Sequence, residues 1–358
     1  MKGISLKKHV ALMRNLSQQR AMVKEHKLTR LYWECTVKCN LNCKHCGTYC
    51  RVLPDLSDMP IDDFVHVLDN IAKTENSHGV TVILTGGEPL MRKDIVECGR
   101  QIYLHGFPWG IHTNGKLLTR EMLTNLIAAG MHDVSIRLDG LEYEHNWLCG
   151  DKECFTQTQE AIQMASGEKS LVCEVVTCVN QRNFDYLGDI YSLLQSMGVK
   201  LWRLYTAYPK GMAANNTNLV LDSYQLRQLM DFIINVRAEG VIDAYYHCEG
   251  FLGKYERQVR DDFYMCHAGV SIGSVLINGD ITGCPNVSHK YAQGSIYEGD
   301  EFMEVWNTCF DVFRKRKWMQ TGICTHCKAF RYCQGNGMHL RSDDGDLLMC
   351  NYDRLNPR

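Results

Sequence analysis

Cys39-Asn-Leu-Asn-Cys43-Lys-His-Cys46 brings three cysteines together early in the chain, and the rest of the sequence is best interpreted outward from this stretch. Its spacing leaves enough chain between the thiols for them to bind three corners of one iron-sulfur cube. The fourth iron would then have no protein ligand, and an open metal position is where chemistry takes place, as in catalytic zinc sites. Because the chain holds 18 cysteines in 358 residues, such a triple arises by chance with a probability of about 0.05.

A second motif lies downstream, where Gly86-Gly87-Glu88-Pro89 follows an apolar stretch at 80–84. With the aromatic lead-in Leu31-Tyr32-Trp33-Glu34 and the cysteine triple, it resembles the radical S-adenosylmethionine (SAM) superfamily over nearly the whole chain. In that family three thiolates hold a [4Fe-4S] cluster, and the amino and carboxylate groups of SAM chelate the fourth iron. An electron from the cluster cleaves SAM to a 5′-deoxyadenosyl radical, which abstracts a hydrogen atom from an unactivated carbon. The resemblance implies that the triple ligates this cluster; ordinary buried thiols or a zinc knuckle are the alternative.

Composition limits the class of protein. The hydrophobic content of 45% is ample for a core, and a net charge of -2 gives no electrostatic reason to expect nucleic acid as a partner. The basic run at 314–317 is interpreted as the solvated face of a helix. The sequence contains neither an apolar stretch of membrane-spanning length nor the apolar core of a signal peptide, so we expect a cytoplasmic protein. Metal binding in a reducing, anaerobic cytosol fits the cysteines better than a disulfide scaffold does.

Apolar, β-rich runs alternate with helical patterns after a leading helix expected at 5–27, which we expect to pack against the barrel. Six strand-helix units in strict alternation predict a parallel sheet with right-handed crossovers, and hence a partial (β/α)6 TIM-like barrel. The expected strands are 30–35, 80–85, 108–113, 133–138, 171–177 and 200–206. The expected helices are 60–76, 92–105, 119–129, 155–166, 183–197 and 222–238.

Three parts of the chain follow from this alternation, which stops after residue 240. We predict an N-terminal helix at 1–28, a barrel at 29–240, and a linker with a small Cys-rich iron-sulfur domain at 241–358. The cysteine triple follows the first strand and the glycine-rich run follows the second. Ligands gather at the carboxyl ends of barrel strands, so we expect both motifs to meet on that rim.

Cofactor-binding residues are predicted along the same rim. The resemblance implies that the run Gly86, Gly87, Glu88 and Pro89 orients the methionyl amine of SAM, with glycines where the backbone must approach closely. Asn114, in a Thr-Asn-Gly run after the third strand, either hydrogen-bonds SAM or fixes the loop. In the fourth strand Ser135 is assigned to the SAM site, and Arg137 clamps the carboxylate of SAM or of a substrate. Residues 177–180 after the fifth strand are expected to line the adenosine, in particular Thr177 and Asn180.

Catalytic candidates are fewer. Asp139 is the best carboxylate for substrate contact or proton transfer. Cys149 stands where related segments commonly carry Arg, which leaves an unusual thiol with Cys154 nearby. Because some radical SAM peptide epimerases use a cysteine as hydrogen donor, Cys149 and Cys248 are candidates, as are Cys154 and Cys178; a structural role is the alternative for each. Cys50, just after the triple, is a candidate for a redox or ligand role.

The C-terminal cysteines resemble the SPASM domain, which in the family holds two auxiliary [4Fe-4S] clusters. The outer cluster would be held by four thiolates, with a zinc site as the alternative: Cys324, Cys327, Cys333 and Cys350. For the inner one, Cys266 and Cys284 match two ligands, but Gly337 occupies an expected cysteine position. Either Cys248, Cys309 or His267 substitutes, or an iron stays open for substrate, or this cluster is absent.

The resemblance implies a radical SAM/SPASM enzyme that modifies a peptide or protein by oxidation, crosslinking or epimerisation, since SPASM relatives include anaerobic sulfatase maturases and peptide maturases. A reductant such as flavodoxin or ferredoxin is implied as a second partner. The N-terminal 30 residues are too short for the fused peptide-recognition domain of many maturases, so we expect a separate recognition partner or direct binding. The alternatives are a small-molecule dehydrogenase, a cofactor or haem biosynthesis enzyme, and a non-catalytic iron-sulfur electron carrier.

Overall fold

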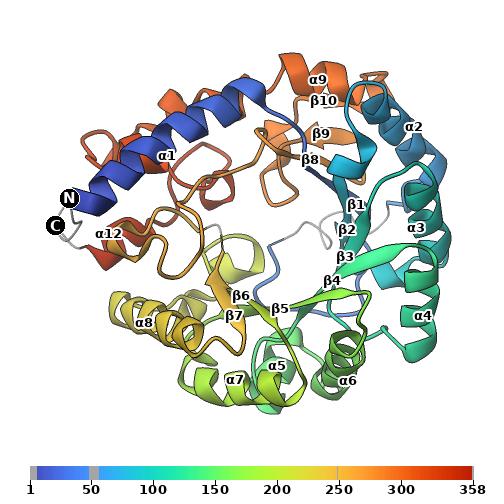
Figure 1. The fold of residues 1–358 in the computed structure, drawn as a ribbon, viewed down its shortest axis with the longest axis horizontal. Helices are drawn as coiled ribbons and strands as arrows, with labels where there is room; N and C mark the ends of the chain where they lie inside the picture. Colours follow the sequence, from blue (N-terminus) through green and yellow to red (C-terminus); the bar gives the residue numbers. More distant parts are fainter. Residues whose placement is uncertain (1–5, 48–55, 248, 357–358) are drawn as a thin grey trace.

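The computed structural model describes residues 6–47, 56–247 and 249–356. Its centre is one curved sheet of ten strands in the order β10-β9-β8-β1-β2-β3-β4-β5-β6-β7, with helices on the outside (Figure 1). Strands β1 to β7 pair in parallel, β8 pairs in parallel with β1, and the β8-β9 and β9-β10 pairs are antiparallel. The expected partial barrel is thereby confirmed.

The strands of the barrel lie within two residues of their predicted bounds: β1 (Arg30–Thr36), β2 (Thr81–Gly86), β3 (Trp109–Thr113), β4 (Met131–Arg137), β5 (Val172–Val179) and β6 (Leu201–Thr206). Four further strands follow: β7 (Asp243–Tyr246), β8 (Ile272–Val275), β9 (Asp280–Thr282) and β10 (Gly294–Ser295). They join both edges of the barrel sheet, so the sheet continues past residue 240, where the alternation of the sequence stops. Short β-like runs are present in the sequence after residue 240, but strands of at most four residues are too short for their bounds or pairing to be predicted.

The helices of the barrel also match prediction: α2 (Ile61–Ala72), α3 (Ile95–Leu104), α4 (Arg120–Ala128), α6 (Cys154–Ser166), α7 (Leu187–Ser196) and α8 (Ser223–Glu239). An additional helix, α5 (Glu142–Cys149), precedes α6. The C-terminal part adds short helices, α9 (Phe302–Thr308), α10 (Asp311–Arg314), α11 (Phe330–Cys333) and α12 (Asn351–Leu355). In the part of the chain that the structure describes, each helix is too short or too polar to cross a lipid bilayer.

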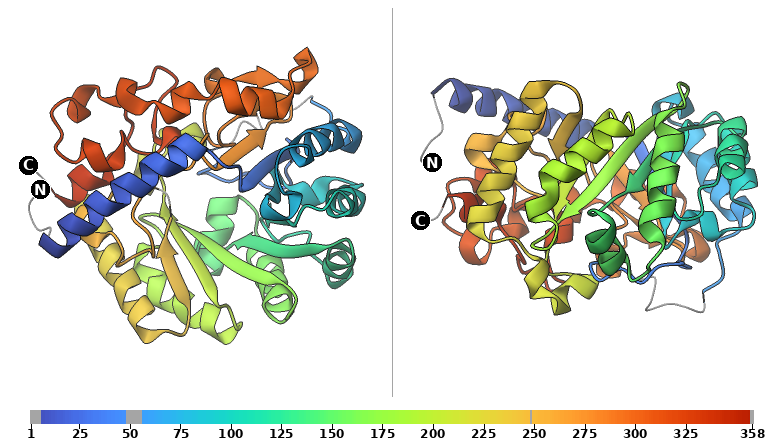
Figure 2. Two further views of the ribbon diagram at one scale, coloured as in Figure 1. Left: turned by 45° about the horizontal axis from the view of Figure 1, so that its top comes forward. Right: turned by 90° about the horizontal axis from the view of Figure 1, so that it is seen from below.

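The N-terminal helix α1 (Leu6–Glu25) packs on the C-terminal part of the chain (Figure 2). Its buried residues Leu12 and Leu16 share one apolar cluster with Phe251, Tyr264 and Tyr332, and Gln19 donates to the carbonyl of Tyr264 at 2.8 Å. The expectation that this helix packs against the barrel is therefore wrong for its buried face. The reason is that the aromatic residues that cover it lie far away in sequence, after residue 250.

The side chains of β1 alternate between the outer face of the sheet, which packs against helices, and the inner face, which surrounds the cavity. Trp33 points outward and stacks on Phe64 of α2, with ring centroids 4.2 Å apart and planes 4° apart. Tyr32 and Glu34 point to the other face, where Tyr32 lines a cavity and Glu34 accepts a hydrogen bond from the amide of Ile277 at 3.1 Å. The outer face of the sheet thus builds the core, and the inner face is left for a site.

Gly99 in α3 offers a test of this helix-on-sheet packing. A Cβ at this position would lie 2.1 Å from Cζ2 of the buried Trp109 on β3. We predict that Gly99→Ala lowers the free energy of unfolding by about 1 to 3 kcal/mol, because overpacking outweighs the better helix propensity of alanine. Gly188→Ala in α7 is the matched control, since a Cβ there meets no atom within 4 Å. This variant should raise the urea unfolding midpoint or leave it unchanged. Equal midpoints for the two variants would contradict this packing.

Candidate active site

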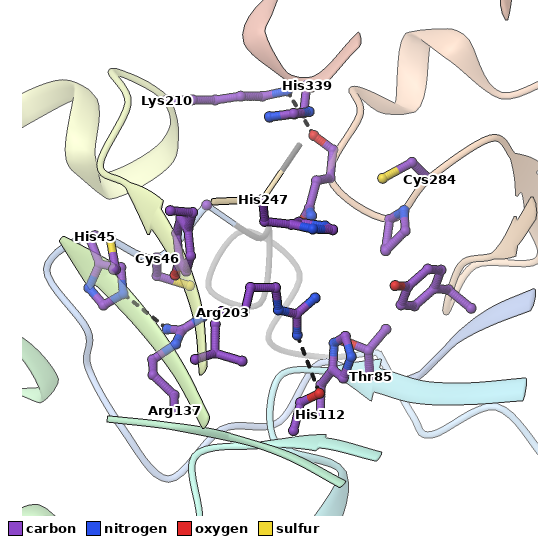
Figure 3. Close-up of a pocket in the computed structure, with 18 of the residues that line it drawn as sticks. His45, Cys46, Thr85, His112, Arg137, Arg203, Lys210, His247, Cys284 and His339 are labelled. Carbon is purple, nitrogen blue, oxygen red and sulfur yellow. Dashed lines mark hydrogen bonds between the residues drawn. The ribbon is translucent and has the colours of Figure 1, made fainter. Parts of the chain in front are cut away.

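A cavity of about 350 Å³ lies at the carboxyl ends of the barrel strands, and C-terminal segments that include Cys284 and His339 form another part of its wall (Figure 3). His45, Cys46 and Arg137 stand on one side of it, and Cys284 stands on the other. The predicted site residues that the structure places on its wall are Cys39, Cys43, Cys46, Gly86, Gly87, Glu88, Asn114, Ser135, Arg137, Cys178, Cys266, His267 and Cys284. The two sequence motifs therefore meet on one rim, together with two C-terminal cysteines.

The loop of the cysteine triple is held by backbone hydrogen bonds. The amides of Asn42 and Lys44 donate to the last carbonyls of α5 at 3.1 and 2.8 Å, and the carbonyl of Cys46 accepts from the amide of Met212 at 2.9 Å. Burial is the main cause that raises the pKa of Cys39 to about 11, and the nearby Cys43 and Cys46 contribute to this rise. Three thiols this close on one cavity wall fit a cluster bound at three corners.

The glycine-rich run is positioned by its neighbour in the sheet. The amides of Gly87 and Glu88 donate to the carbonyls of Thr36 and Lys38 at 2.8 and 2.7 Å. A Cβ would lie 2.0 Å from the Thr36 oxygen at Gly86, where φ is +137°, and 2.1 Å from the Lys38 oxygen at Gly87. Both glycines are thus required by the approach of this run to the start of the cysteine loop.

Glu88 is a buried hub on the cavity wall. Its carboxylate accepts from the hydroxyl of Thr113 at 2.7 Å and from the amides of Asn114 and Leu90 at 2.8 and 3.1 Å. Burial raises its pKa, and these hydrogen bonds oppose the rise. Asn114 in turn donates to the side chain of Asn40 at 2.8 Å, so this network fastens the third strand to the cysteine loop.

Arg137 and Ser135 face the cavity from β4. Nη1 of Arg137 lies 3.1 Å from Nε2 of His45, and the hydroxyl of Ser135 donates to Glu174 at 2.8 Å. Thr177 and Asn180 are not among the described residues that line the cavity. Thr177 donates to the carbonyl of Leu138 at 2.7 Å, and Asn180 donates to that of Cys178 at 2.9 Å.

Of the catalytic candidates that the structure describes, Cys178 lies on the cavity wall, whereas Asp139, Cys149 and Cys154 lie behind it. Asp139 is buried, accepts from the amide of Cys178 at 2.7 Å, and lies 3.6 Å from Nε2 of His45. Burial raises its pKa, and Arg137 opposes the rise. Cys149 is buried beside His145, with 3.5 Å between Sγ and Nε2. Cys248 and Cys50 lie outside the described residues.

Glu249 is a cavity residue that the sequence did not reveal. It follows β7, and one oxygen accepts from the amide and hydroxyl of Thr206 at 2.9 and 2.6 Å and from the hydroxyl of Tyr246. The other oxygen, Oε1, is buried without a hydrogen-bond partner in the described chain. Burial raises the pKa of Glu249 to about 7. Its position at a strand end would have marked it as a candidate had β7 been recognised.

Histidines contribute much of the cavity wall. Five imidazoles line the cavity: His45, His112, His247, His267 and His339. Burial is the main cause that lowers the pKa of each, and for His339 it is lowered to about 4. They are therefore neutral at pH 7, and a neutral imidazole offers a lone pair for a metal or a hydrogen bond.

The outer C-terminal cysteines lie close to one another. Burial is the main cause that raises the pKa of Cys333 to about 12 and that of Cys350 to about 11, and Cys324 and Cys327 contribute to both rises. The buried guanidinium of Arg341 lies beside the Cys324 thiol. Four thiols within electrostatic reach fit a four-thiolate metal site, for which iron-sulfur and zinc are both suited.

The inner pair of C-terminal cysteines, Cys266 and Cys284, lies on the cavity wall, whereas the outer four are not among the described residues that line this cavity. Burial is the main cause that raises the pKa of Cys284 to about 12, and Cys266 contributes to this rise, so the two thiols are neighbours on the cavity wall. Gly337 supplies no ligand, but His339 two residues later lines the cavity, as does His267. Cys309, one of the expected substitutes, is exposed at the end of α9 and is not among the described lining residues.

The raised pKa of Glu249 predicts a pH dependence of stability. Its carboxyl is protonated in the folded chain up to about pH 7, whereas in the unfolded chain it is ionised above its ordinary pKa of 4.5. Stability from this group is therefore present below pH 4.5 and is lost as pH rises through 7. Relative to Glu249→Gln, the wild-type free energy of unfolding should fall by up to about 3 kcal/mol between these limits. Urea unfolding of both chains across this range measures it, and a constant difference would contradict the assignment.

Comparison with known proteins agrees with this geometry. Residues 33–194 match the model of the Radical SAM superfamily. Mycofactocin maturase MftC of Mycolicibacterium smegmatis is 29% identical over 315 residues, which cover 86% of this chain and 77% of that protein. AdoMet-dependent heme synthase of Methanosarcina barkeri is 25% identical over 334 residues, which cover 88% and 93%.

Two solved structures share the fold. Streptococcus suis SuiB bound to precursor peptide SuiA has a TM-score of 0.68 at 17% identity and covers 93% of this chain and 77% of that one. The enzyme anSMEcpe with bound AdoMet and Cp18Cys peptide has a TM-score of 0.68 at 19% identity and covers 91% and 93%. The family match spans the strands that carry both motifs, and its members use a [4Fe-4S] cluster and SAM. The chain therefore contains a radical SAM domain, at residues 33–194.

Proposed function

We propose that this enzyme modifies a peptide or protein side chain or α-carbon by oxidation, crosslinking or epimerisation. The observation that carries the proposal is the cavity, whose wall includes both the cysteine triple and the C-terminal pair Cys266 and Cys284. A substrate in it would lie between the SAM site and an auxiliary metal site. SuiB and anSMEcpe both have this fold. The SuiB structure contains the precursor peptide SuiA, and the anSMEcpe structure contains the Cp18Cys peptide.

The residues on the wall divide into cluster and cofactor roles. Cys39, Cys43 and Cys46 would hold the cluster. When bound, a [4Fe-4S] cluster with one open iron supplies the electron that cleaves SAM to a 5′-deoxyadenosyl radical. Gly86 and Gly87 shape the wall where the amino-acid end of SAM is expected, and Arg137 offers a cation to a carboxylate. The electron source would be a reductant such as flavodoxin or ferredoxin.

The residues past 240 would form the auxiliary iron-sulfur part. The outer four thiols hold one cluster in this proposal, and the inner pair holds an altered or open site because Gly337 contributes no ligand. We retain the division into an N-terminal helix at 1–28, a barrel at 29–240 and a C-terminal part at 241–358, with β7 to β10 as the sheet contacts between the last two.

A haem-type substrate is the second candidate. Five neutral histidines and the thioethers of Met265 and Met338 lie on the cavity wall, and imidazole and thioether are the groups that hold haem iron in proteins. Arg203 and Lys210 on the same wall could pair with carboxylates. Relatives named AdoMet-dependent heme synthase give this candidate a precedent.

Reductive cleavage of SAM tests the cluster site. The anaerobically reconstituted, reduced enzyme should form 5′-deoxyadenosine, and a Cys39→Ala/Cys43→Ala/Cys46→Ala variant should form none, because it cannot hold the cluster. Cys98→Ala/Cys173→Ala is the matched control, since both thiols are buried in the barrel core, and it should retain cleavage. Product formed by the triple variant at the wild-type rate would refute the site.

The same assay separates the two substrate classes. A candidate precursor peptide should raise the rate of 5′-deoxyadenosine formation and change in mass, with loss of hydrogen in oxidation or crosslinking and uptake of solvent deuterium in epimerisation. Iron-coproporphyrin III is the comparison. If it alone raises the rate, the haem-type candidate replaces the peptide.

Iron content tests the outer C-terminal site. We predict about eight irons per chain for the wild type, and about twelve if the inner site also binds a cluster. Cys324→Ala/Cys327→Ala should lose about four irons and still show the SAM-cluster signal. A wild-type content near four irons with bound zinc would show that the four thiols hold zinc instead.

A further inference from the structure

A second cavity, of about 290 Å³, lies between α1 and the C-terminal part of the chain. One part of its wall comes from α1, and the rest comes from the segment before β8, from the region of α10 and from the region of α11. Met265 and Cys266 line both this cavity and the larger one at the barrel rim, so they lie between the two spaces. The second cavity is thus distinct from the proposed substrate site.

The charged residues that the structure describes in the lining of this second cavity are all positive. They are four arginines, contributed by three separate segments of the chain: Arg20, Arg314, Arg316 and Arg331. Within the described chain none of them forms an ion pair with a carboxylate, and Asp311 on α10 pairs with Lys315 at 2.6 Å instead. The whole chain has a net charge of -2, so this concentration of positive charge is local. A cleft lined by one sign of charge concentrates ions of the opposite sign.

Two of the four guanidinium groups are held in place by backbone carbonyls. Nε and Nη2 of Arg314 donate to the carbonyls of Gly269 and Trp306 at 2.8 and 2.6 Å. Nε of Arg316 donates to the carbonyl of Phe313 at 2.7 Å, and its Nη2 donates to two further carbonyls at 3.1 and 3.4 Å. Nη1 of each has no hydrogen-bond partner in the described chain. Carbonyls orient these cations without neutralising them, and a fixed guanidinium loses little entropy when it binds an anion.

The other two arginines are exposed and form the rim of the second cavity. Among the described residues, Arg20 on α1 has no side-chain hydrogen-bond partner. Arg331 on α11 lies over the ring of Tyr332 and donates to the thioether of Met13 at 2.8 Å, which is a weak acceptor. Both guanidinium groups therefore keep most of their donors for a ligand.

A bound metal would supply a counter-charge for one of the four. Arg316 donates to the carbonyl of Cys266, so thiolates of the inner pair would partly balance it if they hold a metal. Arg20 lies on α1, which carries no cysteine, and Arg331 lies on the exposed rim. A metal at the inner pair therefore leaves positive charge at the rim that no acidic residue of the described lining balances.

We propose that this second cavity binds a small oxyanion with two or more negative charges, a phosphate or a polycarboxylate. Guanidinium groups bind both kinds of oxyanion through paired, charge-assisted hydrogen bonds. The volume is near the lower end of the range for small-molecule pockets, which favours a small ligand over the surface of a partner protein. The proposal goes beyond the proposed function and does not depend on which reaction takes place at the barrel rim.

Isothermal titration calorimetry of the anaerobically reconstituted enzyme tests the proposal. Inorganic phosphate and citrate are titrated separately, each against sodium chloride of the same ionic strength, and one of them should bind at one ion per chain. Arg20→Gln/Arg331→Gln should weaken this binding by about tenfold or more, because it removes two charge-assisted contacts. Arg14→Gln/Lys317→Gln is the matched control and should keep the wild-type affinity. It removes the same charge from two exposed side chains that are not among the described lining residues.

The choice of anion identifies the ligand class. Binding of phosphate alone points to a phosphate or phosphate ester, and binding of citrate alone points to a polycarboxylate. Should the double variant lose iron or unfold, Arg20→Gln removes no side-chain hydrogen bond of the described chain and should still weaken binding several-fold.

Three results would overturn the proposal. They are heats equal to the chloride blank for both anions, wild-type affinity in the folded rim variants, and an equal loss in the rim variant and the control, which would mean that only net charge matters. Formation of 5′-deoxyadenosine is measured on the same samples. Its absence in the wild type would count against the proposed function and would leave the anion site standing.

Discussion

The close approach between the end of β2 and the chain that leaves β1 is the constraint on which the site depends. Two amides of the glycine-rich run donate to carbonyls at and just after the end of β1, and only glycine leaves room for them. The parallel pairing of β1 with β2 sets this contact in register. Because the cysteine loop begins at that point, its position relative to the second motif follows from the sheet itself.

Much of this could be predicted from sequence, for a physical reason. Apolar runs of five or more residues, separated by amphipathic helices, identify parallel strands, and parallel strands place their carboxyl ends on one rim. The same reasoning fails for β7, whose four residues Asp243–Tyr246 are too few to show a period. It also fails for α5, where only His145, Leu148 and Cys149 are buried, so its apolar stripe is weak.

Two predicted site residues, Thr177 and Asp139, are not among the described residues that line the cavity, one because of strand parity and the other because of depth. On β5, Val176 and Cys178 face the cavity, while Thr177 between them turns to the carbonyl of Leu138 and the indole of Trp202. A sequence shows that side chains alternate, but not which set faces inward when both sets are apolar or small. Asp139 carries the right functional group one layer too deep, because its loop folds back under Cys178.

The continuation of the sheet beyond the barrel has a consequence for electron transfer. Strand β8 pairs with β1, and β9 leads directly to Cys284, while β1 leads to the cysteine triple. The hydrogen bonds that join β1, β8 and β9 therefore set the separation between the cysteine triple and Cys284. Electron tunnelling weakens steeply with distance, so if both groups hold clusters, as proposed above, the pairing of the strands sets the distance that an electron has to cross.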